Sequence, residues 1–308
     1  MLLGEAEKLT AAGAPHCTRR RFLNVSTGQC VQVEIPELRD HGVLRSSTEG
    51  LLLVVAKGAG AGAVRLLNPL TRQAAELPPI TATGLDFTLA HIGQVSLNNA
   101  GLVDDGRRVL LYHYEREEGS ILAFAKPGDE RWVLVKDTND RLMPTVMVVD
   151  TTAGGEGAKL AVVARLATPI HHMMNDTVHL VEIAGKLMLV HRKMRRVRDA
   201  SGEYDFKKTC KLYRVNLATG KATPAAARGR AIFVGRRRAL AVPPQVFPSL
   251  STNTAYAARV FDVPGSGRHI CIYHLRGGST VTFSNCYESG RLAHPWSIAD
   301  CLTAYVSG

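Results

Sequence analysis

The sequence predicts an all-β protein, and two observations lead to that fold class. Segments of strand length and strand composition recur along nearly the whole chain, whereas convincing helices are few. A phrase made of an apolar run, an Asn or Asp, a Gly- or Thr-rich turn and a second run also occurs several times. This phrase is typical of a β-hairpin, because Asn, Asp and Gly tolerate turn geometry. The chain is therefore expected to consist mainly of antiparallel strands.

The spacing of the repeated phrase favours a β-propeller. Two of its intervals, 44 and 46 residues, match one propeller unit of about 40–45 residues, and an interval of 82 matches two units, whereas one of 66 fits poorly. Isolated hairpins cannot bury both faces, and stacking them around an axis does so. We predict six to seven four-stranded blades and allow for one incomplete blade. A double-sheet sandwich is the structural alternative. The phrase is centred on Asn24, Asn68, Asp150, Asn216 and Asp262.

Further strands and two helices are expected between and around the repeats. In "EIAGKLML", Gly185 marks a tight hairpin turn. Residues 2–12 are compatible with a helix, and residues 294–308 predict a short C-terminal helix with an apolar stripe and Ser297 as its N-cap. The other strand-like segments are residues 50–55, 107–114, 120–125, 131–137, 178–183 and 186–192.

Composition indicates a folded intracellular protein, in the cytoplasm or the nucleus. Of the 308 residues, 45% are apolar and 21% are charged, which is ordinary for a globular chain. The net charge of +11 favours acidic partners. The six cysteines form no CxxC pair, the first residues do not resemble a signal peptide, and the longest apolar run, residues 51–56, is too short to span a membrane.

The motifs that could carry chemistry are incomplete, so we predict no catalytic, cofactor or metal site and no enzyme activity. The Gly-rich segment from Gly58 to Ala63 leads into a strand and not into a helix, and residues 152–159 lack the Gly-Lys-Ser/Thr ending of a phosphate loop. Both are interpreted as hairpin turns. Cys271 and His274 are three residues apart, which places them on opposite faces of a strand, and His171–His172 has no further ligands at short spacing.

The most distinctive charged stretch is "HRKMRRVRDASGEYDFKK", residues 191–208. We interpret it as a long loop between two strands. Charged loops are usually only solvated, but loops on a rigid scaffold are also where partners bind. The segment therefore provides the candidate partner-binding residues, and residues 234–240 are a second, smaller candidate. The predicted contact residues are Arg192, Lys193, Arg195, Arg196 and Arg198.

Several characteristic segments follow one another in order, among them "VHLVEIAGKLMLVHR", "CKLYRVNLATGKATPAAARGRAIFVGRRRALAVPP" and "WSIADCLTAYVS". These segments resemble a plant family of F-box proteins with a carboxy-terminal β-propeller of the KIB type. The resemblance implies a propeller domain over residues 21–308, with Trp132 and Trp296 packed in its core. In the family, the F-box docks on an SCF ubiquitin ligase and the propeller captures the substrate, which in one group is a kinase.

The chain departs from this family pattern at two places. Residues 1–20 are a short N-terminal remnant without a complete F-box, and residues 138–145 replace a strand that relatives carry. We therefore expect a protein-interaction propeller that binds a protein, such as a kinase or another ubiquitylation target, without recruiting the ligase by itself. A nucleic-acid-binding basic propeller and a propeller enzyme with an unrecognised channel site are the alternatives. Neither a cofactor, a membrane nor nucleic acid is an expected partner.

Overall fold

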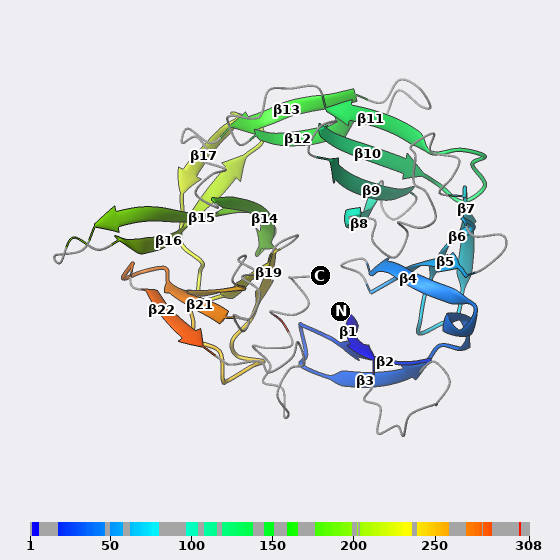
Figure 1. Ribbon diagram of the computed structural model, residues 1–308, viewed down its shortest axis with the longest axis horizontal. Coiled ribbons are helices and arrows are strands. Elements are labelled where there is room, and N and C mark those ends of the chain that lie inside the picture. Colours follow the sequence, from blue (N-terminus) through cyan, green and yellow to red (C-terminus); the bar gives the residue numbers. More distant parts are fainter. Residues whose placement is uncertain are drawn as a thin grey trace. The chain divides into compact units, whose positions relative to one another are not determined.

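The computed structural model consists of β-strands and one short 3₁₀ helix, η1 (Pro36–Arg39), in the part of the chain that it describes (Figure 1). It divides into two compact units, residues 1–24, 29–139 and 149–161, and residues 25–28, 140–148 and 162–308. No helix among the described residues has the length and apolar character needed to cross a membrane. The described residues are 2–5, 18–46, 50–57, 62–79, 97–103, 108–115, 119–137, 145–150, 159–165, 176–198, 202, 204–235, 239–258, 269–278, 280–284 and 302.

The first unit contains three antiparallel sheets whose strands follow one another in chain order. The first sheet has the order β1-β2-β3, the second β4-β5-β6-β7 and the third β11-β10-β9-β8. Such up-and-down sheets arise when short turns join successive strands. The strands are β1 (Leu2–Glu5), β2 (Arg19–Leu23), β3 (Cys30–Glu34), β4 (His41–Ser46), β5 (Leu52–Ala56), β6 (Val64–Leu67), β7 (Ala74–Leu77), β8 (Leu97–Val103), β9 (Arg108–Glu115), β10 (Gly119–Ala125) and β11 (Val133–Asp137).

Strand β5 explains why the chain contains an uninterrupted apolar run. Its residues point alternately to the two faces of the sheet. Leu52 and Val54 pack with Phe22 of the first sheet and with Ile35, which follows β3, whereas Leu53 packs with residues of the third sheet, including Val109. Both faces of the second sheet are therefore covered, and a strand that is buried on both faces reads as a continuous apolar segment.

The second unit contains most of a six-stranded sheet and all of a five-stranded sheet. The six-stranded order is β12-β13-β17-β16-β15-β14, and the five-stranded order is β19-β18-β20-β21-β22. A single parallel pair, Arg165 with Lys221, joins β13 to β17, so β14 to β17 form a four-stranded up-and-down set by themselves. The strands are β12 (Thr145–Asp150), β13 (Lys159–Arg165), β14 (Thr177–Ile183), β15 (Lys186–Arg198), β16 (Tyr204–Asn216), β17 (Lys221–Pro224), β18 (Ala231–Val234), β19 (Ala239–Val242), β20 (Thr254–Ala258), β21 (His269–His274) and β22 (Thr280–Ser284).

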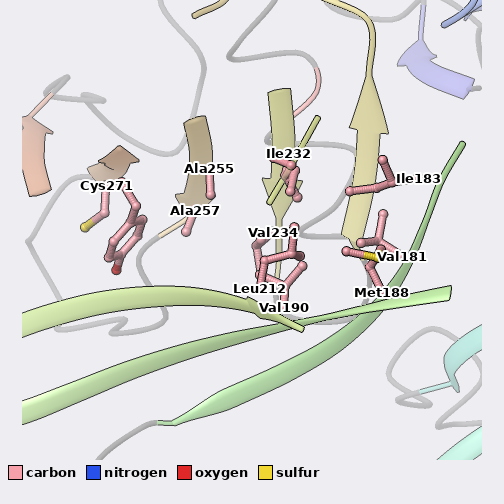
Figure 2. Close-up of a cluster of buried hydrophobic side chains, with 12 residues drawn as sticks. Val181, Ile183, Met188, Val190, Leu212, Ile232, Val234, Ala255, Ala257 and Cys271 are labelled. Carbon is pink, nitrogen blue, oxygen red and sulfur yellow. The ribbon is translucent and has the colours of Figure 1, made fainter. Parts of the chain in front are cut away.

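The core of the second unit lies between these two sheets (Figure 2). Val190 and Leu212 from the six-stranded sheet contact a cluster that includes Ile232 and Val234 from the five-stranded sheet. All four side chains are at most 5% exposed. Burying an aliphatic side chain of this size stabilises a fold by about 1.5–3 kcal/mol. Packing of one sheet face on the next is therefore the main stabilising contact in this unit, as it is in the first.

The repeated Asn-centred phrase builds the same turn each time it is described. The Oδ1 atom of Asn68 accepts hydrogen bonds from the backbone N–H groups of the second and third residues after it, and Asn216 does the same. Four residues after each Asn, the backbone has a positive φ: 75° at Gly28, 65° at Arg72 and 66° at Gly220. This turn requires a short polar side chain that binds the turn backbone, and a residue in the left-handed region of φ.

Other sequence-based expectations have mixed outcomes. The tight turn at Gly185 is confirmed, with φ of 51° at Ala184 and 68° at Gly185, and so is the hairpin around the Gly58 segment, because β5 pairs with β6. A helix over residues 2–12 was wrong for residues 2–5, which form β1 because they find a strand partner in β2. The expected helix at 294–308 lies outside the described residues except for buried Leu302.

Of the two tryptophans, only Trp132 is among the described residues. Trp132 is only 3% exposed, which confirms its expected place in the core, and its indole N–H donates to the Pro78 carbonyl at 3.0 Å. Trp296 lies outside the described residues. Residues 138–144, from the segment that replaces a strand of the family, also lie outside them.

Replacing Gly220 by Ala should lower the free energy of unfolding by about 1–2 kcal/mol, since a side chain in the left-handed region is strained. A Cβ atom at this position would also lie 3.1 Å from the Val163 carbonyl oxygen. Urea unfolding followed by fluorescence measures the change. Gly101→Ala is the matched control, because no atom lies within 4 Å of its Cβ position. Equal stability of Gly220→Ala and the wild-type chain would contradict this account of the turn.

Candidate functional site

The charged segment 191–208 forms a β-hairpin, so its interpretation as a long loop was wrong. β15 and β16 pair continuously from Met188 with Arg214 to Arg198 with Tyr204. The sequence pattern misleads because charged residues occupy both faces of these strands. A strand without a covering sheet is solvated on both faces, and the alternation of apolar and polar residues that identifies a strand is then absent.

The outer half of this hairpin extends beyond the rest of its sheet (Figure 1). β14 pairs with β15 only as far as Arg192, and β17 pairs with β16 only from Tyr213 onward. Residues 193–198 and 204–209 are therefore a two-stranded element, which we call the basic ribbon. It contains six cationic residues and one acidic residue. The cations are Lys193, Arg195, Arg196, Arg198, Lys207 and Lys208.

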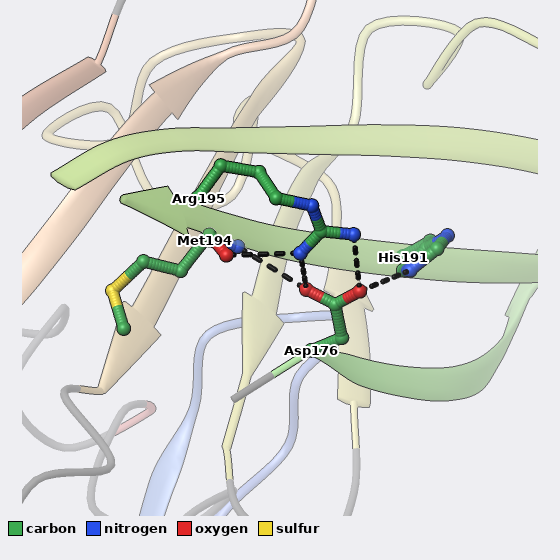
Figure 3. A network of polar contacts seen from close by, with 4 residues as sticks. All are labelled: Asp176, His191, Met194 and Arg195. Carbon is green, nitrogen blue, oxygen red and sulfur yellow. Dashed lines mark hydrogen bonds and ion pairs between the residues drawn. The ribbon is translucent and has the colours of Figure 1, made fainter. Parts of the chain in front are cut away.

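A buried carboxylate holds the base of the basic ribbon (Figure 3). Asp176 precedes β14, and its side chain is 0% exposed. Its Oδ1 and Oδ2 atoms accept hydrogen bonds from the Arg195 guanidinium at 2.6 and 2.8 Å. Oδ1 also accepts from the Met194 backbone N–H at 3.3 Å. Two nitrogens of the guanidinium thus bind the two oxygens of one carboxylate, the usual bidentate geometry of an arginine–carboxylate pair. Hydrogen bonding to Asp176 raises the pKa of Arg195.

The structure separates the five predicted contact residues by their surroundings. Arg192 is only 7% exposed, opposite Cys210, so its side chain is covered and does not belong to an accessible surface. Arg195 is committed to Asp176. Lys193 is half-buried, Arg198 is exposed, and Arg196 lies on the ribbon opposite Phe206.

Sequence reasoning missed the residues that β16 and the start of β14 contribute. Lys207 is exposed and lies opposite Arg195. Lys208 lies opposite Met194, and its carbonyl accepts a hydrogen bond from Thr280 at 3.0 Å. The sequence did contain a signal for Lys207 and Lys208, because the segments on both sides of Gly202 are rich in cations. A hairpin would bring these two segments side by side. No pattern in the sequence pairs Asp176 with Arg195.

Like charges accumulate around the ribbon. Burial is the main cause that lowers the pKa of Lys193, and the positive charges of Arg195 and Lys211 lower it further, with partial compensation by Asp176. At the other end of the same strand, Arg214 and Arg228 lower the pKa of Lys186. Protonated side chains repel one another here, so the binding of an anion would be favourable.

Two histidines near the ribbon, buried His191 and half-buried His179, are neutral at pH 7. Burial lowers the pKa of His191 to about 4, and the nearby charge of Lys193 adds to this effect. Burial and the charge of Arg192 lower the pKa of His179 to about 4. The His191 Nε2 atom lies 3.8 Å from Asp176 Oδ2, which is too long for a hydrogen bond. These imidazoles therefore act as packed, uncharged groups in the folded state.

The remaining candidates from the sequence give no constellation of chemical groups. Cys271 is buried and His274 is exposed on the same strand, which agrees with opposite faces. The pair His171–His172 and residues 152–158 lie outside the described residues. In residues 234–240, Val234 and Ala239 pair at the β18–β19 hairpin, and the arginines between them are not described. Among the residues described, no group of three or more His, Cys, Asp or Glu side chains could hold a metal ion.

Comparison with known proteins gives one informative match. The family model described as KIB1-4 beta-propeller matches residues 22–274. No curated protein matches the sequence. Among solved structures, MPT-1, a GDP-Man-dependent mannosyltransferase from Leishmania mexicana, has 10% identity, covers 82% of this chain and 89% of its own, and has a TM-score of 0.24. A likeness this weak carries no argument.

Replacing Asp176 by Asn should lower the free energy of unfolding by about 1–3 kcal/mol, because Arg195 loses its charged partner. The amide oxygen can still accept from Met194, so the loss reports the charge. Urea unfolding at pH 7 provides the measurement. Glu182→Gln is the control, since Glu182 is an exposed acceptor for the Gly185 N–H on neighbouring β14 and should change stability little. Equal effects of the two substitutions would contradict the anchoring role of Asp176.

Stability should fall as the pH is lowered from 7 to 5, and His191 should contribute about 2 kcal/mol of that loss. The unfolded chain binds a proton at His191 below its ordinary pKa of 6.5, whereas the folded chain does so only near 4. Acid therefore favours unfolding within this window. Urea unfolding at both pH values, for the wild-type chain and His191→Asn, measures the difference. The same pH dependence in both proteins would show that His191 is not buried in neutral form.

Proposed function

Since the chain belongs to the KIB1-4 β-propeller family, we propose that it is a protein-interaction module whose partner binds the basic ribbon. Membership confirms the all-β propeller that the repeats predicted. The blade number and the incomplete blade stay predictions. The likeness to the substrate-recognition domain of ubiquitin-ligase F-box proteins and the kinase-type partner, both implied by the resemblance, also stay predictions.

The observation that carries the proposal is the basic ribbon itself. Its two strands continue beyond both neighbouring strands of the sheet, and they present cations on a paired backbone. Exposed apolar surface accompanies the charge, because Val197 is 36% exposed between Arg196 and Arg198. Interfaces combine such apolar contacts with complementary charge. The expected partner surface is therefore acidic, with at least one apolar side chain.

Order in the free protein strengthens this proposal. A flexible charged loop loses conformational entropy when a partner fixes it, whereas a paired ribbon has already lost that entropy on folding. The Asp176 carboxylate fixes the base of the ribbon by three hydrogen bonds. This order supports binding as the proposed role of the ribbon.

Nucleic acid is the second candidate, because the major groove of B-DNA admits a two-stranded β-ribbon. The two candidates differ in their dependence on salt. If nucleic acid binds, the logarithm of the binding constant decreases linearly with the logarithm of the salt concentration. The slope is set by the number of phosphates contacted. Binding of a folded acidic protein through a mixed apolar and charged surface would depend on salt less steeply.

Photo-crosslinking from the ribbon identifies and tests the partner. A benzoylphenylalanine at Val197 should capture a protein from an extract of the source cells, whereas the same group at Leu217 should not. Both positions are exposed, at 36% and 49%, and they lie at opposite ends of the β15–β16 hairpin. The captured protein is then purified, and its affinity for the unlabelled chain is measured by calorimetry.

Charge reversal decides whether the ribbon carries the affinity. Arg198→Glu with Lys207→Glu should weaken binding of that partner by about tenfold or more, since like charges across an interface are unfavourable. Arg214→Glu with Lys221→Glu is the matched control at exposed positions outside the ribbon. Unchanged affinity in the ribbon variant, or equal loss in both variants, would contradict a ribbon-directed interaction.

A further inference from the structure

A cavity lies beside the basic ribbon, where the outer edge of β16 faces the β21–β22 hairpin. Its volume is about 350 Å³. Three residues of β16, Thr209–Lys211, form one wall, and residues 273–278 together with Thr280 form the other. All of these residues belong to the second unit. The cavity is therefore made by segments that are distant in sequence, and it shares only Thr209 with the ribbon.

The backbone of β16 presents one residue to this cavity. Alternate residues of a strand direct their N–H and C=O groups to the same edge. On the outer edge, the Lys208 carbonyl accepts from the Thr280 hydroxyl at 3.0 Å, and the Leu212 carbonyl accepts from the Ala225 N–H at 2.9 Å. Cys210 lies between them and thus has its N–H and C=O on that edge. No described strand pairs with β16 at this position.

The cavity wall is cationic. Its described lining residues include Lys211 and Arg276, both exposed, and His274, and none of those described is Asp or Glu. Arg192 lies opposite Cys210 in the ladder and adds a positive charge beside the cavity. A donor N–H group, nearby cations and no carboxylate form a suitable environment for an anion, as they do in other phosphate and carboxylate sites.

The side chains of Cys210 and Tyr273, which line the cavity, do not supply a compensating negative charge. Burial raises the pKa of the Cys210 thiol to about 12, despite the opposing effect of Arg192. Burial also raises the pKa of Tyr273. Both groups therefore stay neutral at pH 7, and the positive charge of the wall is available to a bound group.

We propose that this cavity binds one anionic side chain of an acidic peptide segment in the partner protein. An oxygen of that side chain accepts from the Cys210 N–H, while Lys211 and Arg276 supply the opposite charge. This inference rests on the proposed function, since it specifies the chemistry of the protein partner. The anion is a phosphate or a carboxylate, and a peptide that presents either group has the same recognition chemistry here.

Three fluorescein-labelled peptides test the cavity directly. They have the same acid-rich flanks and carry phosphoserine, glutamate or serine at the central position. The phosphoserine or the glutamate peptide should bind the full chain at least about tenfold more tightly than the serine peptide, measured by fluorescence anisotropy. The stronger of the two identifies the source of the anion. Equal binding of all three peptides, or no binding of any, would overturn the proposal.

Two pairs of substitutions localise the binding. Lys211→Ala with Arg276→Ala should reduce the affinity for the preferred peptide by about tenfold or more. Arg214→Ala with Lys221→Ala removes the same charge from exposed positions outside the cavity lining and should have less than about twofold effect. Thermal unfolding confirms that each variant is folded. Equal losses in the two variants would show attraction to overall charge and would exclude a site in the cavity.

The Cys210 amide supplies a readout that does not depend on substitution of the charges. Labelling the chain with ¹⁵N-cysteine gives one backbone signal for each of the six cysteines. Cys210→Ser removes the Cys210 signal and thereby assigns it. Addition of the preferred peptide should shift this signal downfield, as expected when an N–H donates to an anion. A Cys210 signal that does not move while the peptide binds would overturn the proposal.

The ribbon variant distinguishes failure of this inference from failure of the proposed function. Arg198→Glu with Lys207→Glu leaves the cavity lining intact, so it should still bind the preferred peptide. If this variant loses the peptide and the cavity variant retains it, the anion binds the ribbon, and the cavity assignment is wrong while the interaction role stands. If the crosslinking partner binds independently of the ribbon, the proposed function fails even when the cavity binds peptide.

Discussion

A single buried carboxylate determines how the basic ribbon leaves its sheet. β14 pairs with β15 no further than Thr177 with Arg192, and the next N–H on that edge of β15 belongs to Met194. Asp176 takes the place of a further strand residue, because its Oδ1 atom accepts from this N–H. The same carboxylate forms an ion pair with Arg195, one of the cations at the base of the ribbon. One side chain thus satisfies the backbone and reduces the repulsion among the cations that follow.

The second constraint is electrostatic, and it links structure to function. Cations crowd the ribbon and the cavity beside it. Burial lowers the pKa of Lys193, and the charges of Arg195 and Lys211 lower it further. The fold tolerates this crowding because sheet faces packed on neighbouring sheets stabilise the second unit independently of the ribbon. An acidic partner would relieve the repulsion. Arrangements that store unfavourable charge at a surface are characteristic of binding sites, although ion-pair networks produce them as well.

The elements that could be predicted from sequence are those governed by local chemistry. Asn68 and Asn216 form equivalent turns because an Asn side chain can reach the following N–H groups, whatever the rest of the fold does. Residues 50–55 were predicted to form a strand from their composition, and β5 is apolar throughout because both of its faces are covered. Gly185 marks its hairpin for the same local reason.

What sequence could not predict depends on contacts between distant residues. Residues 191–208 were interpreted as a loop because their charged residues remove the alternation of apolar and polar residues that is typical of a strand. The segment forms a ribbon because its two arms pair with each other. The role of Asp176 depends on its approach to Arg195, 19 residues away. The cavity needs β16 beside the β21–β22 hairpin, whose residues begin more than fifty positions later. None of these contacts leaves a motif.

Hydrogen–deuterium exchange of the free chain, followed by mass spectrometry, tests the central claim most directly. If the basic ribbon is an ordered pair of strands, the amides that β15 and β16 share across the ladder, such as those of Lys193 and Lys207, should exchange at least about tenfold more slowly than in an unstructured peptide. Exchange at the unstructured rate throughout residues 193–198 and 204–209 would show that this segment is a charged loop, and the binding surface described here would not exist.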